Sequence, residues 1–126
     1  VFGDIDIQGH LDWCSERCRA AGLEACFPLW QEERLELVKE CLASGFKPIV
    51  TVADPRRLPA GFAGRPLTEQ LLGEMAKLGA DPCGENGEYH TFVPEGPIFA
   101  RPIPVAVGPA QLVDGYAVAP LALQAT

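Results

Sequence analysis

The 126-residue chain has the length of one compact domain, with a core that needs no disulfide or metal to be stable. Apolar residues make up 48% of it, and 17 acidic against 10 basic residues give a net charge of −7, which disfavours global disorder and a basic nucleic-acid-binding surface. No apolar run approaches the roughly 20 residues that span a bilayer, so we expect neither a nucleic-acid nor a membrane partner.

The first half of the chain predicts alternating strands and helices. Short apolar runs typical of buried strands cover residues 1–5, 24–27 and 47–53. Helical spacing of apolar residues covers residues 7–21, with Asp6 as the expected N-cap, and residues 32–44. A glycine ends each helix. This order of elements favours parallel strands joined by right-handed crossovers, the pattern of an α/β domain.

The second half changes character after residue 53. Prolines and glycines indicate a loop, after which Thr68 is expected to cap a helix over residues 69–78. Alternating β-branched and aromatic residues predict a strand over 89–93, and two further strands are expected over 103–107 and 116–121. Turn sequences between the last two predict antiparallel pairing. The sequence therefore predicts a parallel α/β part, residues 1–53, and a smaller α+β lobe, residues 54–126.

Five cysteines, an odd number with irregular spacing, argue against a secreted disulfide framework and favour a reducing, cytoplasmic setting. Cys14 and Cys18 would share one helix face, where packing is a more common role than metal binding. Cys83 is a free-thiol candidate, but no neighbouring base in the sequence is placed to activate it.

Residues 81–90, DPCGENGEYH, form the most informative segment of the chain. Gly84 and Gly87 permit a positive φ and a close approach of backbone to a ligand. They flank Glu85 and Asn86 in a loop that also carries Glu88 just before the predicted strand. The glutamates could hold Mg²⁺, orient an ammonium group or act as a general base, and the spacing does not choose among these roles. The alternative is a solvated acidic turn that leads into a hairpin.

The string GENGEYHTFV, followed by GPIF at residues 96–99, resembles the signature of the diphthine–ammonia ligase family. Members are also described as N-type ATP pyrophosphatases of the adenine-nucleotide alpha-hydrolase-like superfamily. Three weaker elements agree in order: Gly3-Asp4 after the first strand, GLE and PLW at 22–30, and GRPL at 64–67. The resemblance covers residues 1 to about 104.

The resemblance implies a Rossmann-like (HUP-type) nucleotide domain and an ATP-dependent ligase that forms AMP while joining a carboxylate to ammonia, with ATP and Mg²⁺ as cofactors. A protein substrate and a homodimer are left open. The candidate catalytic residues are Glu85, Glu88 and His90. The candidate substrate- or nucleotide-binding residues are Gly3, Asp4, Trp30, Arg65, Gly84, Asn86, Gly87 and Thr91.

Several of these residues also have structural interpretations. Asp4 suits a helix-entry turn, and a lone strand histidine such as His90 is often a hydrogen-bonded structural residue. Trp30 could stack on adenine or pack in a core. Arg65 could pair with a phosphate or form a surface salt bridge. Arg56-Arg57 is interpreted as a solvated pair.

The chain has no Ser-Gly-Gly-Lys-Asp-Ser-type loop, which grips ATP phosphates in the resembled family, and no other phosphate-binding glycine motif. We therefore expect it to be the C-terminal portion of a longer protein. Two alternatives stay open: a non-catalytic nucleotide- or ligand-binding regulatory domain derived from the same scaffold, and a structural module whose motif loop forms a subunit interface.

Overall fold

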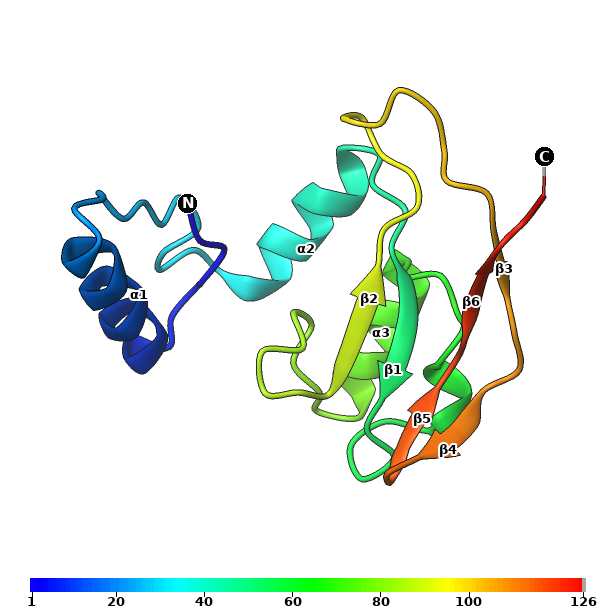
Figure 1. Ribbon diagram of the computed structural model, residues 1–126. Coiled ribbons are helices and arrows are strands. Elements are labelled where there is room, and N and C mark those ends of the chain that lie inside the picture. The colour runs from blue at the N-terminus through cyan, green and yellow to red at the C-terminus, as the bar shows by residue number, and fades with distance from the viewer. Residues whose placement is uncertain (126) are drawn as a thin grey trace. The chain divides into compact units, whose positions relative to one another are not determined.

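The computed structural model describes residues 1–125, which form two compact units, Val1–Leu37 and a larger unit from Val38 onward. The helices are α1 (Gln8–Ala20), α2 (Arg34–Ala43), the short 3-10 helix η1 (Ala60–Phe62) and α3 (Glu69–Lys77). The strands are β1 (Ile49–Ala53), β2 (Tyr89–Phe92), β3 (Val105–Val107), β4 (Gln111–Val113), β5 (Tyr116–Val118) and β6 (Leu121–Leu123) (Figure 1). None of the helices in this described part has the length and apolarity that a bilayer crossing requires.

The unit Val1–Leu37 contains α1 but neither of the two strands predicted in it. Residues 1–5 and 24–27 are joined by a hydrogen bond from Phe2 N to the Cys26 carbonyl at 2.9 Å, but they form no strand. The strand predictions were wrong here, because two short segments without further neighbours do not make a stable sheet. The cap prediction was also wrong, since Ile7 is the N-cap of α1 and Asp6 instead accepts from Arg34 Nε at 2.9 Å.

The larger unit is built on a four-stranded sheet of order β2-β1-β5-β4, in which every strand pair is antiparallel. Because β1 pairs directly with β2, it lies in the same unit as the motif rather than in a separate part ending at residue 53. The antiparallel β3-β6 pair forms a second sheet, and the antiparallel tail predicted from the turns is confirmed.

A return segment explains why β2 runs opposite to β1. Residues 64–67 pass back along β1, where Val50 N donates to the Arg65 carbonyl at 2.9 Å and Gly64 N donates to the Val50 carbonyl at 2.7 Å. The helix α3 therefore starts beside the beginning of β1, and the strand that follows α3 returns antiparallel to β1. The sequence predicted parallel crossovers because it gave no sign of this extra pass.

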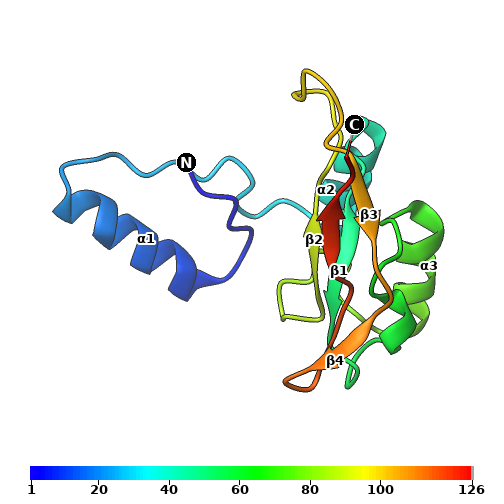
Figure 2. The ribbon, with the colours of Figure 1, turned by 45° about the vertical axis from the view of Figure 1, so that its right-hand side comes forward.

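The core of the larger unit lies between the sheet and α3, which covers one sheet face (Figure 2). Three residues of α3, Leu71, Leu72 and Met75, are buried against strand residues that include Val50 and Tyr89. Full burial of each such side chain stabilises the fold by about 1.5–3 kcal/mol. As predicted, Thr68 caps α3, since its side chain accepts a hydrogen bond from Leu71 N.

Candidate functional site

Glu85 and Glu88, two of the three predicted catalytic residues, lie between α3 and β2. Residues 81–88 of this connection are here called the motif loop. Asp81 organises its first turn, because its Oδ1 accepts from Cys83 N at 3.1 Å and its Oδ2 accepts from Glu85 N at 2.8 Å. Such side-chain to backbone hydrogen bonds are the usual way in which aspartate stabilises a turn. The loop is therefore an ordered structure with its own hydrogen bonds.

Glu88 closes the motif loop from the inside. It is only 3% exposed, and its carboxylate accepts from Asn86 N at 3.1 Å, Asn86 Nδ2 at 3.3 Å and Asp81 N at 3.4 Å. Arg57 Nη1 lies 3.3 Å from Glu88 Oε1. Burial raises the pKa of Glu88, but the hydrogen bonds and the Arg57 charge outweigh it, so its pKa lies below the ordinary value. Glu88 is thus an ionised carboxylate, largely used to hold the loop.

Asp54, which the sequence analysis did not single out, is the second buried acid of this region. It directly follows β1 and is 3% exposed. Its carboxylate accepts from Arg56 N at 3.0 Å, Arg56 Nε at 2.8 Å and Arg56 Nη2 at 2.9 Å. The Arg56 hydrogen bond holds the pKa of Asp54 below its ordinary value despite burial. The sequence pattern that could have identified Asp54 is an acidic residue directly after a predicted buried strand and shortly before two arginines.

As predicted, Arg56 and Arg57 are both exposed, but each also has a buried acidic partner. Arg56 pairs with Asp54 and lies 5.8 Å from the centre of the Tyr116 ring, while Arg57 pairs with Glu88. Two buried carboxylates and two guanidinium groups therefore join the end of β1 to the start of β2.

Gly84 and Tyr89 fix the other side of the motif loop. Gly84 has φ +67, and a Cβ built there would lie 3.0 Å from the Tyr89 carbonyl oxygen and 3.1 Å from its ring. The Tyr89 hydroxyl donates to the Pro82 carbonyl, and burial is the main reason that the pKa of Tyr89 is raised. The sequence analysis expected the backbone of Gly84 to approach a ligand closely. In the structure, Gly84 approaches Tyr89 of the protein itself.

The remaining predicted residues of this unit lie outside the motif loop. His90 and Thr91 are exposed on the edge strand β2, opposite Val52 and Val50. Arg65 forms a two-pronged ion pair with Glu74, with N–O distances of 2.7 and 2.8 Å. The structure therefore brings together Gly84, Glu85, Asn86, Gly87 and Glu88.

The candidates Gly3, Asp4 and Trp30 belong to the other unit. There, Asp4 Oδ1 lies 3.2 Å from His10 Nδ1, and Cys14 Sγ donates to Asp4 Oδ2 at 3.9 Å. Trp30 packs edge-on against Phe27, with ring centres 6.3 Å apart. The side chains of Asp4 and Trp30 each have a structural partner within their own unit.

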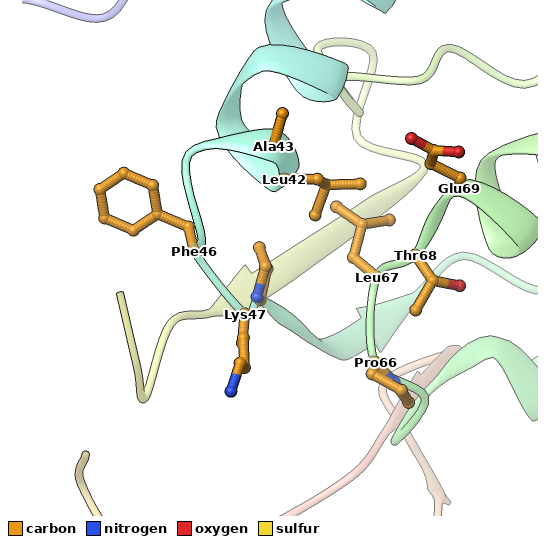
Figure 3. A pocket seen from close by; sticks show the side chains of 9 residues that line it. Leu42, Ala43, Phe46, Lys47, Pro66, Leu67, Thr68 and Glu69 are labelled. Carbon is orange, nitrogen blue, oxygen red and sulfur yellow. The ribbon is translucent and has the colours of Figure 1, made fainter. Parts of the chain in front are cut away.

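A groove of about 400 Å³ lies at the opposite end of β1 from the motif loop. Figure 3 shows Leu42 and Leu67 in its wall, with the Phe46 ring further along. Gly96, the first residue of the GPIF string, packs so closely on Phe46 that a Cβ would lie 2.3 Å from the ring. Gly96 thus packs against Phe46, which lines this groove.

The carboxylates of Asp81 and Glu88 do not fit a magnesium site. Both oxygens of Asp81 accept backbone N–H groups, and the Glu88 oxygens accept three N–H groups and face Arg57. Mg²⁺ needs carboxylate oxygens that are free to coordinate. Among residues 1–125, no cluster of three or more His, Cys, Asp or Glu side chains is arranged to hold a metal ion.

Comparison with known proteins assigns the chain to a family. Residues 33–116 match the family model described as the diphthamide synthase C-terminal domain. The chain belongs to this family. The matched residues of this diphthamide synthase C-terminal domain include β1, α3 and the whole motif loop.

Individual relatives agree with this assignment. The chain is 34% identical to the diphthine–ammonia ligase of Mus musculus over 109 residues, which cover 83% of this chain and 41% of that protein. The diphthine–ammonia ligase of Schizosaccharomyces pombe is 33% identical over 89 residues, which cover 68% of this chain and 15% of that protein. The Homo sapiens protein of the same name is 30% identical over 109 residues. The chain therefore spans less than half the length of these relatives.

Proposed function

We propose that this chain forms the C-terminal part of a cytoplasmic, ATP-dependent and AMP-forming amide ligase of the diphthine–ammonia ligase type. The observation that carries the proposal is the motif loop, an ordered, hydrogen-bonded loop within the residues that match the family model. The relatives named diphthine–ammonia ligase supply the reaction class.

The proposed reaction activates a carboxylate in two steps. The carboxylate oxygen attacks the α-phosphorus of ATP and pyrophosphate leaves, which gives an acyl adenylate. Ammonia then attacks the acyl carbon, AMP leaves, and an amide and a proton are the other products. Adenylation is needed because a free carboxylate is a poor acyl electrophile. ATP, ammonia and the carboxylate are the substrates, and a protein-bound carboxylate is our expectation from the name of the relatives.

In this scheme the motif loop shapes the acyl and ammonia side of the site. Glu85 is half-buried and Asn86 is exposed, and the Asn86 carboxamide is oriented because its Nδ2 is held on Glu88. Side chains fixed in this way are suited to orient ammonia or to stabilise an oxyanion without reorganisation. We place His90 and Thr91, exposed on the adjoining strand, at the border of this site.

We further propose that Val1–Leu37 is the end of a Rossmann-like nucleotide domain. The helix α1 lies in sequence between residues 1–5 and 24–27, which form no strands but share the Phe2 N to Cys26 carbonyl hydrogen bond, and this order is that of a strand-helix-strand unit. Gly3, Asp4 and Trp30 are its candidate nucleotide-binding residues.

A non-catalytic ligand-binding domain is the second candidate. The pairing of Asp54 with Arg56 and of Glu88 with Arg57 favours it, because acids engaged in this way can serve stability alone.

The test compares Glu85→Gln and Glu88→Gln in the full-length protein by ATP-dependent amide formation and thermal melting. We expect amide formation to fall by about 10²-fold or more in each variant, the scale for loss of a positioned group. Glu69→Gln, at an exposed glutamate of α3, is the matched control. Normal turnover in both motif-loop variants would favour the non-catalytic domain.

A further inference from the structure

The motif loop depends on one side chain that ties its two ends together. Glu88, the last residue of the loop, accepts from the N–H groups of Asp81, its first residue, and of Asn86. At 3% exposure this carboxylate has little water to solvate it. A buried carboxylate without a counter-charge is unfavourable, so a cation beside Glu88 stabilises this loop geometry further.

Arg57 is the cation that the structure places there. Its Nη1 lies 3.3 Å from Glu88 Oε1, and no other ion pair to Glu88 is formed within residues 1–125. The backbone of Arg57 is held in turn, because its N–H and that of Leu58 donate to the Asp54 carbonyl at 2.9 and 2.8 Å. Leu58 is 1% exposed and part of the core. The guanidinium thus projects from a rigid turn toward the loop.

We propose that Arg57 is a positioning residue, which holds the motif loop in its closed, hydrogen-bonded form through its ion pair with Glu88. It acts through Glu88 on the Asn86 carboxamide and on the backbone N–H groups of Asp81 and Asn86 rather than by contact with a substrate. Only its kinetic consequence rests on the proposed ligase function. The closing of the loop can be measured on the chain itself.

The adjacent Arg56 provides a matched control. Arg56 is also a guanidinium on the 54–58 turn and also pairs with a buried acid, Asp54, and its hydrogen bonds reach Asp54 and Tyr116. Arg57 Nε also lies 4.0 Å from Asp54 Oδ2, so the two arginines differ in the pair that Arg57 forms with Glu88. A variant of Arg56 removes the same charge from the same turn and leaves the Glu88 pair in place. It therefore separates a general effect of charge from the specific pairing.

The experiment follows backbone amide exchange by NMR in the wild type, Arg57→Gln, Arg57→Lys and Arg56→Gln. In Arg57→Gln we expect the Asp81 and Asn86 amides to exchange about five- to tenfold faster, the scale of one partly screened ion pair. The Leu72 amide, which donates to the Thr68 carbonyl at 2.9 Å inside α3, should exchange at the wild-type rate. Arg57→Lys should restore most of the protection, and Arg56→Gln should leave both loop amides unchanged.

The salt dependence of amide exchange is an independent readout, because an arginine that stabilises the loop by packing alone would not make exchange depend on salt. Because the Arg57 side chain is 49% exposed, 1 M NaCl should weaken its pair with Glu88 and speed Asp81 and Asn86 exchange in the wild type but not in Arg57→Gln. Equal exchange of these amides in the wild type and Arg57→Gln would overturn the proposal. So would an equal acceleration in Arg56→Gln.

Kinetics in the full-length protein then link the closed loop to turnover. Arg57→Gln should lower kcat for amide formation about tenfold with KM for ATP unchanged, because the loop is placed on the acyl side of the site. A lowered kcat together with faster loop exchange supports positioning, whereas wild-type kcat with an opened loop refutes the kinetic part. If the wild-type full-length protein forms no amide, the proposed function fails, and the exchange data still decide whether Arg57 holds the loop.

Discussion

At the scale of single residues, the site is organised by two buried carboxylates that are stabilised in different ways. Glu88 accepts hydrogen bonds mostly from N–H groups of its own loop, whereas Asp54 accepts them from the backbone N–H and the guanidinium group of Arg56. Both remain ionised because each has enough donors to offset its desolvation. A carboxylate that holds a loop in this way is a weaker candidate for a general base than Glu85.

The lowered pKa values of Glu88 and Asp54 predict acid sensitivity. A group whose folded-state pKa is depressed stabilises the protein above its unfolded pKa, and this contribution is lost as the pH falls through the folded pKa. The ordinary values are 4.5 for Glu88 and 3.8 for Asp54. We therefore expect the Tm to fall below about pH 4.5, and to fall less steeply in Glu88→Gln. Thermal melting between pH 7 and pH 3 measures this, and identical slopes would contradict it.

Gly84 and Gly87 offer a test of how tightly the motif loop is packed. Both have positive φ, +67 and +80, but only at Gly84 does an added Cβ meet other atoms, those of Tyr89. Gly87→Ala should cost about 1–2 kcal/mol from backbone strain alone. Gly84→Ala should cost about 2–4 kcal/mol, because crowding against Tyr89 adds to the strain. Urea unfolding of both variants measures the difference, and equal losses would show that the Tyr89 contact relaxes freely.

At the scale of elements, the sequence predicted what local signals determine. The caps at Thr68 and the glycines after the first two helices were confirmed, since Gly22 and Gly45 have φ +68 and +92. The antiparallel pairing of β1 with β2 was not predictable, because it depends on the return segment 64–67 along β1, which carries no strand periodicity of its own. For the same reason the motif loop was found from its glycines and acids, while its partners Asp54 and Arg57, distant in sequence, were missed.

Gly73 in α3 and Gly79 just after it should respond to alanine substitution with stability changes of opposite sign. Gly73 lies inside the helix and an added Cβ would meet no atom within 4 Å, whereas Gly79 follows the helix with φ +68. Gly73→Ala should stabilise the protein by about 0.5–1 kcal/mol, since alanine has the higher helix propensity. Gly79→Ala should destabilise it by about 1–2 kcal/mol because of the left-handed backbone. Denaturant midpoints for both variants test this assignment of the end of α3.

At the scale of the whole molecule, the hydrophobic core and the motif loop belong to the same unit. Every member of the main core cluster lies at residue 38 or later, and the family match begins at residue 33. The loop is therefore placed by a sheet and a helix with their own core. The nucleotide chemistry that we propose for the intact protein needs groups that bind the phosphates of ATP. Whether the cationic side chains of this unit are such groups can be tested directly by ATP binding to this chain.

The isolated 126-residue chain should bind ATP weakly or not at all. Its three arginines near the sheet are already paired, Arg56 with Asp54 at 2.8 Å, Arg57 with Glu88 at 3.3 Å and Arg65 with Glu74 at 2.7 Å. The net charge of −7 opposes binding of the polyphosphate further. Calorimetric titration with Mg-ATP should give no micromolar affinity for the chain, whereas the full-length protein should bind. Micromolar binding by the chain alone would mean that one of these ion pairs opens to receive phosphate, and Arg65→Gln and Arg56→Gln would then identify which one.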